Sequence, residues 1–432
     1  MIISNIYKNI ENSPLILFRI LFGFLVAAES FGAILTGWVK RVFIETHFTF
    51  TFIGFEWLEI LHGDIMYLYF IIMGLCGILI MLGAKYRFAI ISFTFLWAGV
   101  YLAQKTAYNN HYYLLLVISF YMCFLPANKY KSFDAKWNPK IKSEVMPYWV
   151  SLLFIIQISI VYFFAAIAKF YPDWLDGTFT KNLLLGSTDI EFIKNIFSKK
   201  WFYLFIAYSG ILFDLLIVPF LLFKRTRTIA FIASFIFHIF NAIVLQIGIF
   251  PFFALGFILF FYEPEAIRRL FFKKKKPVFI ESFDKSHKSI VQYILIPFLI
   301  IQLLLPLRHH FIKGDVLITE EGHRLSWRMM LRQKSGYIQF KILDIDTKKT
   351  TSYYYNKNLS YKQVNALATK PDFIWQYCQR IKKEYEGKNI SIFIDCKNSI
   401  NRKPYRTLID PKLDFAKAKW NYFSHNDWVL ID

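Results

Sequence analysis

The first 306 residues of this chain are dominated by long apolar segments, such as Ile71–Gly83 and Ile229–Tyr262. Hydrophobic residues make up 56% of the sequence, whereas soluble domains hold about 45–50%. A helix needs about 20 apolar residues to cross a bilayer, and nine segments approach that length. They are 14–37, 64–83, 87–104, 111–126, 148–169, 201–222, 229–247, 250–263 and 288–306. Because 111–126 is short and 250–263 can be re-entrant, we expect an α-helical polytopic membrane bundle of eight or nine spans.

Basic residues follow these apolar segments in a regular way. The 51 lysines and arginines against 30 acids give a net charge of +21, but they form no single stripe of the kind that binds nucleic acid. Their main clusters follow even-numbered spans, at 85–87, 129–142, 224–227 and 268–276. Lysine and arginine favour cytoplasmic loops. We therefore expect a multi-pass protein of the bacterial inner membrane, surrounded by lipids, with its C-terminal domain on the exoplasmic (periplasmic) side and no nucleic-acid partner. The loop after the fifth span departs from the rule, with Lys181, Lys194, Lys199 and Lys200.

The pattern changes near Leu307, which divides the chain into a transmembrane domain, 1–306, and a soluble domain, 307–432. An amphipathic helix is predicted over Ser360–Tyr385, ending near Gly387. Alternation of apolar and polar residues predicts strands at Tyr337–Ile345, Ser352–Tyr355 and Asn389–Asp395. We therefore expect a mainly β domain of the α+β type, with one substantial helix, after the bundle.

Cysteine and histidine patterns point to no metal site, because neither an HExxH nor a CxxC spacing occurs. Cys76 and Cys123 fall within apolar spans and are expected to behave as small buried hydrophobes. Cys378 and Cys396 lie in the soluble domain and can pair only in an oxidising compartment. The sequence leaves that pairing open, and we expect no metal cofactor.

Lys169 stands at the end of the fifth apolar span, after the run Val161–Ala168. Charged residues at membrane depth are costly and often functional. One interpretation is a lysine whose amine extends to the lipid headgroups. The other is a desolvated amine that serves as a general base at neutral pH.

Several polar residues accompany this lysine at membrane depth. Asn109, Asn110 and His111 open the fourth span, and His238 and Asn241 lie three apart on the seventh span, hence on one helical face. The sequence is consistent with two roles for these residues: interhelical hydrogen bonding and ligand binding. We leave three charged residues in spans unassigned, as ion-pair or capping candidates: Arg19, Glu29 and Asp214.

Six segments, in order, resemble the vitamin K-dependent γ-glutamyl carboxylase family and its bacterial relatives, the HTTM-domain proteins. They are Asn109–Leu114, Ile158–Trp174, Gly210–Leu215, Phe237–Asn241 with Ile247–Phe250, Ser326–Met330, and Ile409–Asp414. Each segment alone is a weak signal, whereas six in the family's order indicate kinship along most of the chain.

The resemblance implies an enzyme of the carbon–carbon lyase class that uses reduced vitamin K (menaquinol or phylloquinol), O₂ and CO₂. In the family a lysine base deprotonates the quinol, which reacts with O₂ to give a strongly basic alkoxide. This base removes a γ-proton from a glutamate of a protein or peptide, and CO₂ captures the carbanion. The base maps to Lys169, and His111 maps to the histidine thought to stabilise the carbanion or orient CO₂. Residues expected to bind the quinol or the substrate are Asn109, Asn110, His238, Asn241, Trp174, His323, Trp327 and Arg328.

The chain departs from the animal pattern at several points. Ala168 replaces the first of two tandem lysines, Leu331–Arg332 stand where a histidine follows the methionines, and the soluble domain is shorter. No counterpart of the animal disulfide is evident. These departures leave two alternatives open: a quinol epoxidase without carboxylase activity, and a non-enzymatic transport or lipid-handling protein. A membrane anchor for an exoplasmic binding domain is a third, which leaves Lys169 and His111 unexplained.

Overall fold

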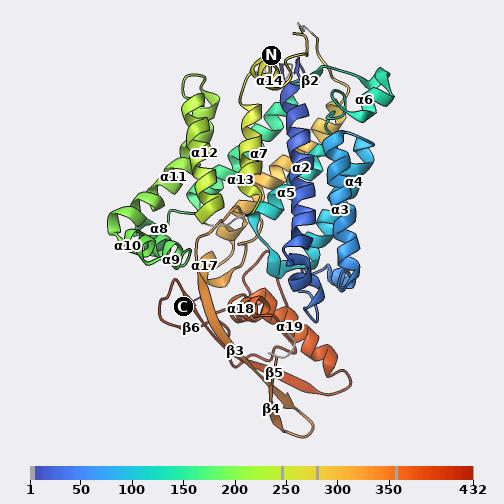
Figure 1. Cartoon of the computed structure of the whole chain (residues 1–432). Helices are drawn as coiled ribbons and strands as arrows, with labels where there is room; N and C mark the ends of the chain where they lie inside the picture. The colour runs from blue at the N-terminus through green and yellow to red at the C-terminus, as the bar shows by residue number, and fades with distance from the viewer. Residues whose placement is uncertain (1–4, 245–247, 279–281, 356–358, 432) are drawn as a thin grey trace.

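A computed structural model describes residues 5–244, 248–278, 282–355 and 359–431. A helical bundle forms one end of the molecule, and an antiparallel sheet with two helices forms the other (Figure 1). Within the described residues, seven helical segments are long and apolar enough to cross a membrane. They are α2 (Ser13–Leu35), α3 (Ile65–Leu82), α4 (Tyr86–Ala103), α7 (Trp149–Ile167), α11 (Lys200–Leu222), α12 (Arg227–Val244) and the run Lys288–Phe311.

Two more apolar segments complete the bundle. Helix α13 (Phe250–Phe257), extended by η5 (Ile258–Phe260), meets α14 (Pro264–Phe271) at an angle of 117°, and this bent pair is an eighth span if counted as one. Helix α5 (Asn110–Met122) has 13 residues, most of them buried, which is short of the ~20 needed for a full span. The predicted membrane bundle is confirmed, with seven or eight spans. Residues 245–247, at the end of the predicted span 229–247, lie outside the described residues.

Short elements occupy the connections between the long helices. The last span is itself a run of α15 (Lys288–Ile290), η6 (Val291–Leu295), α16 (Ile296–Leu304) and η7 (Leu305–Phe311). The short helices in the connections are η1 (Lys40–Ile44), η2 (Glu56–Ile60), η3 (Lys105–Ala107), α6 (Phe133–Trp137), η4 (Pro139–Ile141), α8 (Pro172–Leu175), α9 (Thr178–Leu185), α10 (Glu191–Ser198) and α17 (Val316–Thr319). Strands β1 (Asn9–Glu11) and β2 (Val145–Pro147) pair and tie the N-terminal segment to the start of α7.

Close packing of α2 on α3 depends on glycines. A Cβ added at Gly23 would lie 2.2 Å from the backbone nitrogen of Met81, and one added at Gly77 would lie 2.7 Å from that of Ala27. Small residues let helix backbones approach closely in a bilayer, where packing rather than hydrophobicity drives association. The two glycines therefore set the position of α2, which carries Glu29 towards the site described below.

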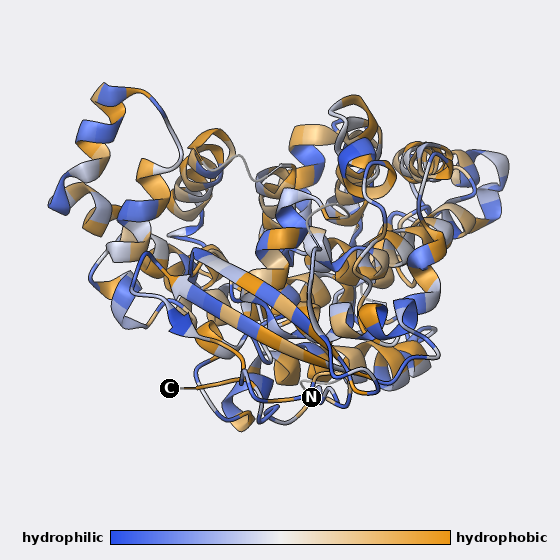
Figure 2. Cartoon of the chain, turned by 90° about the horizontal axis from the view of Figure 1, so that it is seen from below, coloured by the Kyte–Doolittle hydropathy of each residue, from blue (hydrophilic) through white to orange (hydrophobic). Residues whose placement is uncertain are grey.

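The sheet at the other end has the order β4-β3-β5-β6, all antiparallel. Its strands are β3 (Lys334–Asp344), β4 (Thr350–Tyr353), β5 (Ile390–Ile400) and β6 (Arg406–Thr407). Pairs such as Ile338 with Cys396 and Phe340 with Ile394 point to the buried face. Figure 2 looks onto the sheet from below and shows this alternation as bands of colour along its long strands. The three predicted strands are present, and the α+β character is confirmed.

The single helix predicted over Ser360–Tyr385 is wrong in one respect, because two helices cover this range. Helix α18 (Tyr361–Thr369) begins with a capping box between Ser360 and Gln363, and α19 (Pro371–Glu384) starts at a proline. Proline has no backbone N–H to continue a helix, and it pushes the preceding residue towards extended backbone. Lys370 has φ −133° and ψ 113°, so the chain turns there, and both helices cover the buried face of the sheet.

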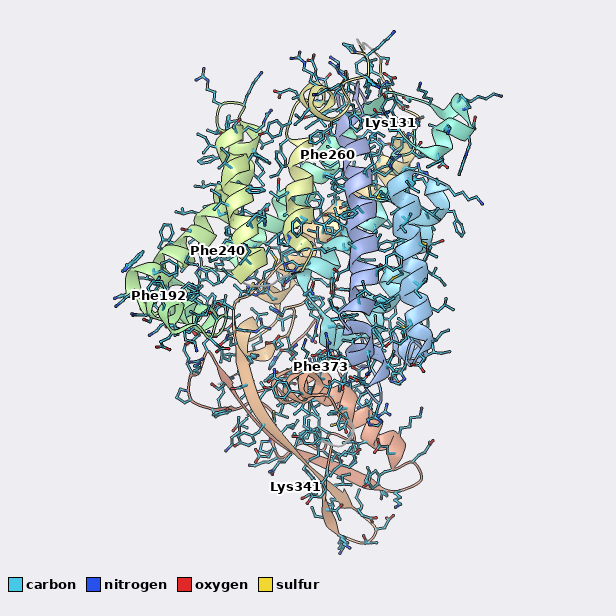
Figure 3. All side chains as sticks on the ribbon, in the orientation of Figure 1. Lys131, Phe192, Phe240, Phe260, Lys341 and Phe373 are labelled. Atoms are coloured by element: carbon cyan, nitrogen blue, oxygen red, sulfur yellow. The ribbon has the colours of Figure 1, made fainter. Side chains whose placement is uncertain are left out.

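The two ends of the molecule share a core at their junction. Phe48 and Phe50, from the connection between α2 and α3, pack among the apolar side chains of α19 and the sheet. Phe373 of α19 lies between the sheet and the bundle (Figure 3). All four cysteines are free thiols, and Cys378 and Cys396 are both buried in this core.

Candidate functional site

Two cavities meet where the bundle joins the C-terminal part. The first, about 380 Å³, lies within the bundle and has mainly apolar walls. The second, about 310 Å³, lies beside the C-terminal part and has polar walls. Asn109, His111 and Met330 line both cavities, so they mark the boundary between an apolar chamber and a polar chamber.

The start of α5 places these boundary residues. Asn109 is the N-cap: its backbone is extended, and its side-chain oxygen accepts a hydrogen bond from the Tyr112 amide at 2.7 Å. Asparagine is favoured at this position because its side chain satisfies a helix N–H that lacks a partner. Asn110 donates to the carbonyl oxygen of Arg328 at 3.1 Å and accepts from the Tyr108 hydroxyl. Both asparagines therefore hold His111 in place and tie α5 to the segment around Arg328.

His111 is the free member of this group. Its imidazole stacks on the ring of Phe250, with centroids 4.0 Å apart and planes at 18°. Neither ring nitrogen forms a hydrogen bond to another described residue, so both can meet a ligand in either chamber. The short helix α5 brings this histidine to the boundary between the two chambers.

The apolar chamber is lined by aromatic and aliphatic side chains of three helices. Its walls include Tyr112, Leu115 and Ile118 of α5 and Phe250, Phe253 and Phe257 of α13. Glu29 of α2 is the one carboxylate among the described lining residues, and its Oε1 accepts a hydrogen bond from the Tyr112 hydroxyl at 2.8 Å. The volume falls within the range of small-molecule sites, about 300–1,000 Å³.

The polar chamber is strongly cationic. Its described walls contain five cations and one carboxylate: Arg324, Arg328, Arg332, Lys334, Lys370 and Glu320. Glu320 is held by Arg332 and by Lys334, whose amine lies 2.6 Å away. Burial opposes ionisation of Glu320, but these two cations hold its pKa well below the usual range. Arg324 is paired with Asp372, outside the walls. The positive charge that remains on Arg328 and Lys370 makes this chamber suited to an anionic group.

His323 and Arg328 lie in the walls of this polar chamber, as a binding role requires. His323 faces Arg332 at 3.0 Å, and burial together with Arg332 lowers the pKa of His323 well below its ordinary value. Arg328 also contacts His309 of η7. Trp327 is fully buried and packs on Tyr113 of α5, with ring centroids 4.9 Å apart. Trp327 thus supports the walls and touches neither cavity.

Backbone strain is concentrated in the segment that forms this wall. Four non-glycine residues have φ between 49° and 63°: Glu320, Leu325, Trp327 and Met330. Left-handed backbone at such residues costs of order 1–3 kcal/mol each and clusters at functional sites. Two hydrogen bonds help to hold the strained conformation: Asn110 donates to the carbonyl oxygen of Arg328, and the backbone amide of Leu325 donates to the Tyr108 hydroxyl oxygen.

Lys169 follows the last turn of α7 and is buried, with 8% of its surface exposed. Its amine lies 2.5 Å from Asp214 of α11 and 3.0 Å from the carbonyl oxygen of Ala165, and faces the ring of Trp174 at 5.3 Å. This arrangement differs from a lysine that extends to the headgroups. Asp214, for which the sequence analysis assigns no role, is thus the ion-pair partner of Lys169. A carboxylate within the membrane is the expected partner of a lysine at that depth.

Three of the candidate residues are absent from the described walls of the two chambers: Lys169, His238 and Asn241. His238 Nε2 lies 3.1 Å from the Tyr162 hydroxyl, and its ring lies 6.0 Å from that of Phe250. Tyr162 lies on α7, seven residues before Lys169, and a helical rise over seven residues is about 10 Å. The candidate residues are therefore divided between two places: His111, Asn109 and Asn110 line the chambers, whereas Lys169 and His238 do not. Ile247, at the edge of the Phe237–Phe250 motif, lies outside the described residues.

Trp174 takes part in the surroundings of Lys169 and not in the chambers. Its indole N–H donates to the carbonyl oxygen of Ala207 on α11 at 3.0 Å. The neighbouring Asp173 binds Asn401 and Lys403 at 2.8 and 2.6 Å. The Asp173–Trp174 pair therefore fixes the end of α7 to both α11 and the C-terminal part. Within the described residues no cluster of three or more metal-binding side chains occurs.

Comparison with known families covers nearly the whole chain. Residues 7–265 match the HTTM domain, and residues 287–432 match the lumenal domain of vitamin K-dependent gamma-carboxylase. The first match alone spans more than half of the 432 residues. No solved structure matches the chain.

Proposed function

This chain belongs to the HTTM-domain family and is a homologue of the vitamin K-dependent gamma-carboxylases, and from that premise we propose that it couples quinol epoxidation to glutamate carboxylation. The substrates would be reduced vitamin K, O₂, CO₂ and a glutamate of a protein or peptide. The observation that carries the proposal is the meeting of an apolar and a cationic chamber at His111. A reaction that joins a lipid-soluble quinol to an acidic peptide needs both kinds of chamber in contact.

The apolar chamber suits the headgroup of a naphthoquinol. Phe250, Phe253 and Tyr112 supply flat apolar surfaces, and His111 and Glu29 supply the few polar groups that orient a ligand in such a site. When bound and oxidised by O₂, the quinol supplies the strong base that removes the glutamate γ-proton. The chamber's role is to hold the headgroup away from water, which would otherwise consume that base.

The cationic chamber suits the carboxylates of the substrate. Arg328 and Lys334 lie in its walls with His323, and His111 stands at the boundary, where a glutamate side chain would meet the quinol. Preorganised cations stabilise negative charge that develops on the γ-carbon. We assign to His111 the stabilisation of this charge or the orientation of CO₂.

We assign the role of general base to Lys169, with Asp214 stabilising the ammonium that forms. Their 2.5 Å contact places the two groups within hydrogen-bonding distance. Tyr162 precedes Lys169 by seven residues and is hydrogen-bonded to His238, whose ring lies 6.0 Å from that of Phe250 in the chamber wall. A proton leaving the chamber would pass along these side chains to the lysine. Asn241 shares the helical face of His238 and would support it.

The orientation in the membrane follows from charge. The protein has several spans, and two of its basic clusters include residues of α6 and α14, which lie at the end of the bundle away from the sheet (Figure 1). Lys131, of the first of these clusters, lies at that end (Figure 3). With lysine and arginine on the cytoplasmic side, residues 1–306 form the membrane domain and residues 307–432 form an exoplasmic domain. We place the protein in a bacterial inner membrane.

The test is a pair of product assays on the purified full-length protein. With reduced vitamin K or menaquinol and O₂, the wild type should form quinone epoxide, and Lys169→Ala should abolish it. The control is Lys181→Ala, a lysine of α9 outside this cluster. Normal turnover by Lys169→Ala would remove the lysine from the mechanism.

Carboxylation is measured separately, as radiolabelled CO₂ bound to a glutamate-containing peptide. His111→Ala should lose the label. Epoxide without label in the wild type would restrict the function to quinol epoxidation, the alternative that the Leu331–Arg332 departure keeps open. Substrate counterflow in proteoliposomes without quinol consumption would instead support a transport protein.

A further inference from the structure

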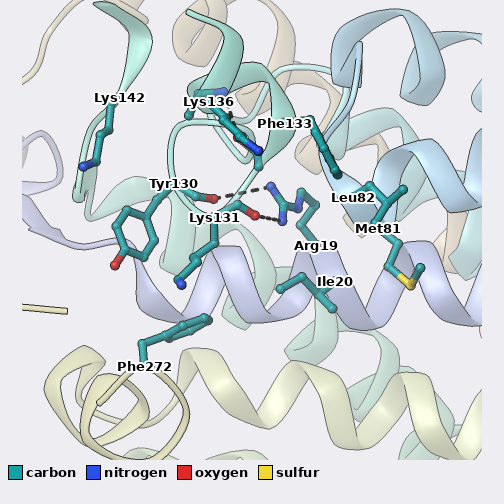
Figure 4. A pocket seen from close by; sticks show the side chains of 12 residues that line it. Arg19, Ile20, Met81, Leu82, Tyr130, Lys131, Phe133, Lys136, Lys142 and Phe272 are labelled. Carbon is teal, nitrogen blue, oxygen red and sulfur yellow. Dashed lines mark hydrogen bonds between the residues drawn. The ribbon is translucent and has the colours of Figure 1, made fainter. Parts of the chain in front are cut away.

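A third cavity, of about 760 Å³, lies at the end of the bundle opposite the sheet. Figure 4 shows its walls, which come from α2, the C-terminal end of α3, the segment after α5, and Phe272 beyond α14. The lining residues are Arg19, Ile20, Met81, Leu82, Tyr130, Lys131, Ser132, Phe133, Ala135, Lys136, Lys142 and Phe272. The quinol and glutamate chemistry proposed above uses none of them.

Arg19 forms the base of this cavity. Its side chain is fully buried, and its two Nη atoms donate to the carbonyl oxygens of Tyr130 and Lys131 (Figure 4) and to that of Ala127. Its Nε has no hydrogen-bond partner among the described residues. The partners of Arg19 are all neutral carbonyls, and no described carboxylate lies within ion-pair distance of it. Arg19 therefore has no direct ion-pair partner among the described residues, although the charge of Asp134 acts on it from farther away.

Three lysines surround this base and add to the charge. Lys131, Lys136 and Lys142 are exposed, and none of them forms an ion pair with the described residues. The nearby carboxylate, Asp134, is engaged elsewhere: it accepts hydrogen bonds from the backbone amides of Lys85 and Tyr86. The cavity thus presents four cations and no lining carboxylate to any molecule that enters it.

The rest of the wall is mostly apolar and lies near the start of α2 and the end of α3. Ile20, Met81 and Leu82 form one side, and the rings of Phe133 and Phe272 form two others (Figure 4). Such a wall would be unfavourable around a small hydrated ion. It suits the glycerol and upper acyl carbons of a lipid whose headgroup meets the lysines.

We propose that this cavity binds the headgroup of an anionic phospholipid of the membrane leaflet opposite the sheet, with its phosphate among Lys131, Lys136 and Lys142. The cations match the lipid charge, and the apolar wall matches the start of its chains. Basic pockets between transmembrane helices on the cytoplasmic side are known to bind such headgroups. The proposal is independent of the catalytic assignment, because it uses other residues at the other end of the bundle.

The experiment is a lipid titration of the full-length protein followed by native mass spectrometry. Dioleoyl phosphatidylglycerol is compared with dioleoyl phosphatidylcholine, which has the same chains and no net charge. The test variant combines Lys131→Gln, Lys136→Gln and Lys142→Gln. The matched control combines Lys273→Gln, Lys274→Gln and Lys276→Gln, which removes the same charge from exposed lysines outside the cavity.

We expect phosphatidylglycerol to bind the wild type more tightly than phosphatidylcholine. The test variant should lose about 100-fold of this affinity, since each basic residue near an anionic lipid contributes about five-fold. The control should change by a few-fold at most, and lipid-free melting temperatures should show that all variants fold. Equal losses in both variants, or equal binding of the two lipids, would overturn the proposal. If glycerol 1-phosphate competes as well as the lipid does, the cavity is an anion site and the lipid assignment is wrong.

Discussion

A buried ion network joins the bundle to the C-terminal part, and its removal should strongly destabilise the protein. Lys105 of η3 is 2% exposed, and its amine lies 2.6 Å from Asp372 of α19. Arg324 reaches the same carboxylate at 2.8 Å. Replacing Asp372 by asparagine leaves two buried cations without a carboxylate among the described residues. Breaking a buried pair in this way costs about 3–5 kcal/mol.

Thermal unfolding followed by tryptophan fluorescence measures this cost, because Trp375, Trp420 and Trp428 lie in or against the C-terminal core. We expect Asp372→Asn to lower the unfolding midpoint by roughly 10 °C. Asp427→Asn is the control, because Asp427 is exposed and forms no ion pair with the described residues. If Asp372→Asn had the same unfolding midpoint as the Asp427→Asn control, the network would add no net stability.

Three further predictions follow from the same structure. Although burial opposes ionisation, Arg324 and Lys105 lower the pKa of Asp372 from 3.8 to about 2. The ionised Asp372 therefore contributes about 2 kcal/mol to the free energy of unfolding. This stabilisation is present above the ordinary pKa and is lost as pH falls towards 2. The midpoint difference between wild type and Asp372→Asn should therefore shrink in acid, and a constant difference would contradict this sign. Gly77→Leu should prevent α2 and α3 from packing, because a Cβ at Gly77 already meets Ala27 at 2.7 Å; detergent-solubilised yield should collapse, whereas Gly32→Leu, in open space, should express normally. Phe250→Leu removes the ring that stacks on His111, a contact worth about 0.5–1.5 kcal/mol, and should raise the KM for quinol by about 2- to 13-fold; an unchanged KM would exclude Phe250 from the quinol site.

Much of the architecture could be predicted from hydrophobic pattern alone. Long apolar runs identify the membrane bundle because a bilayer accepts few other sequences. The strands around Phe340 and Ile394 were visible as alternation, since one face of the sheet is buried. The predicted long helix failed at Lys370–Pro371 because amphipathic periodicity continued through a residue that cannot donate a hydrogen bond. Pro371 was the signal, present in the sequence, that one helix ends and another begins there.

The site was predictable in its parts and not in its assembly. The pattern singled out Lys169, His111 and His238 because polar groups at membrane depth are costly. Their separation depends on Tyr162 and Phe250, whose aromatic side chains look like ordinary core residues in the sequence. The pairing of Lys169 with Asp214 depends on how α7 packs on α11, which a single sequence does not specify.

In the proposed function, one reaction joins the two chambers at His111. An experimental structure of the protein with a non-oxidisable naphthoquinol analogue and a glutamate-containing peptide tests it most directly. We expect the analogue's ring against Phe250 and His111 in the apolar chamber, with a glutamate carboxylate near Arg328 in the cationic chamber. A quinol ring bound elsewhere, or a peptide that leaves the cationic chamber empty, would contradict it.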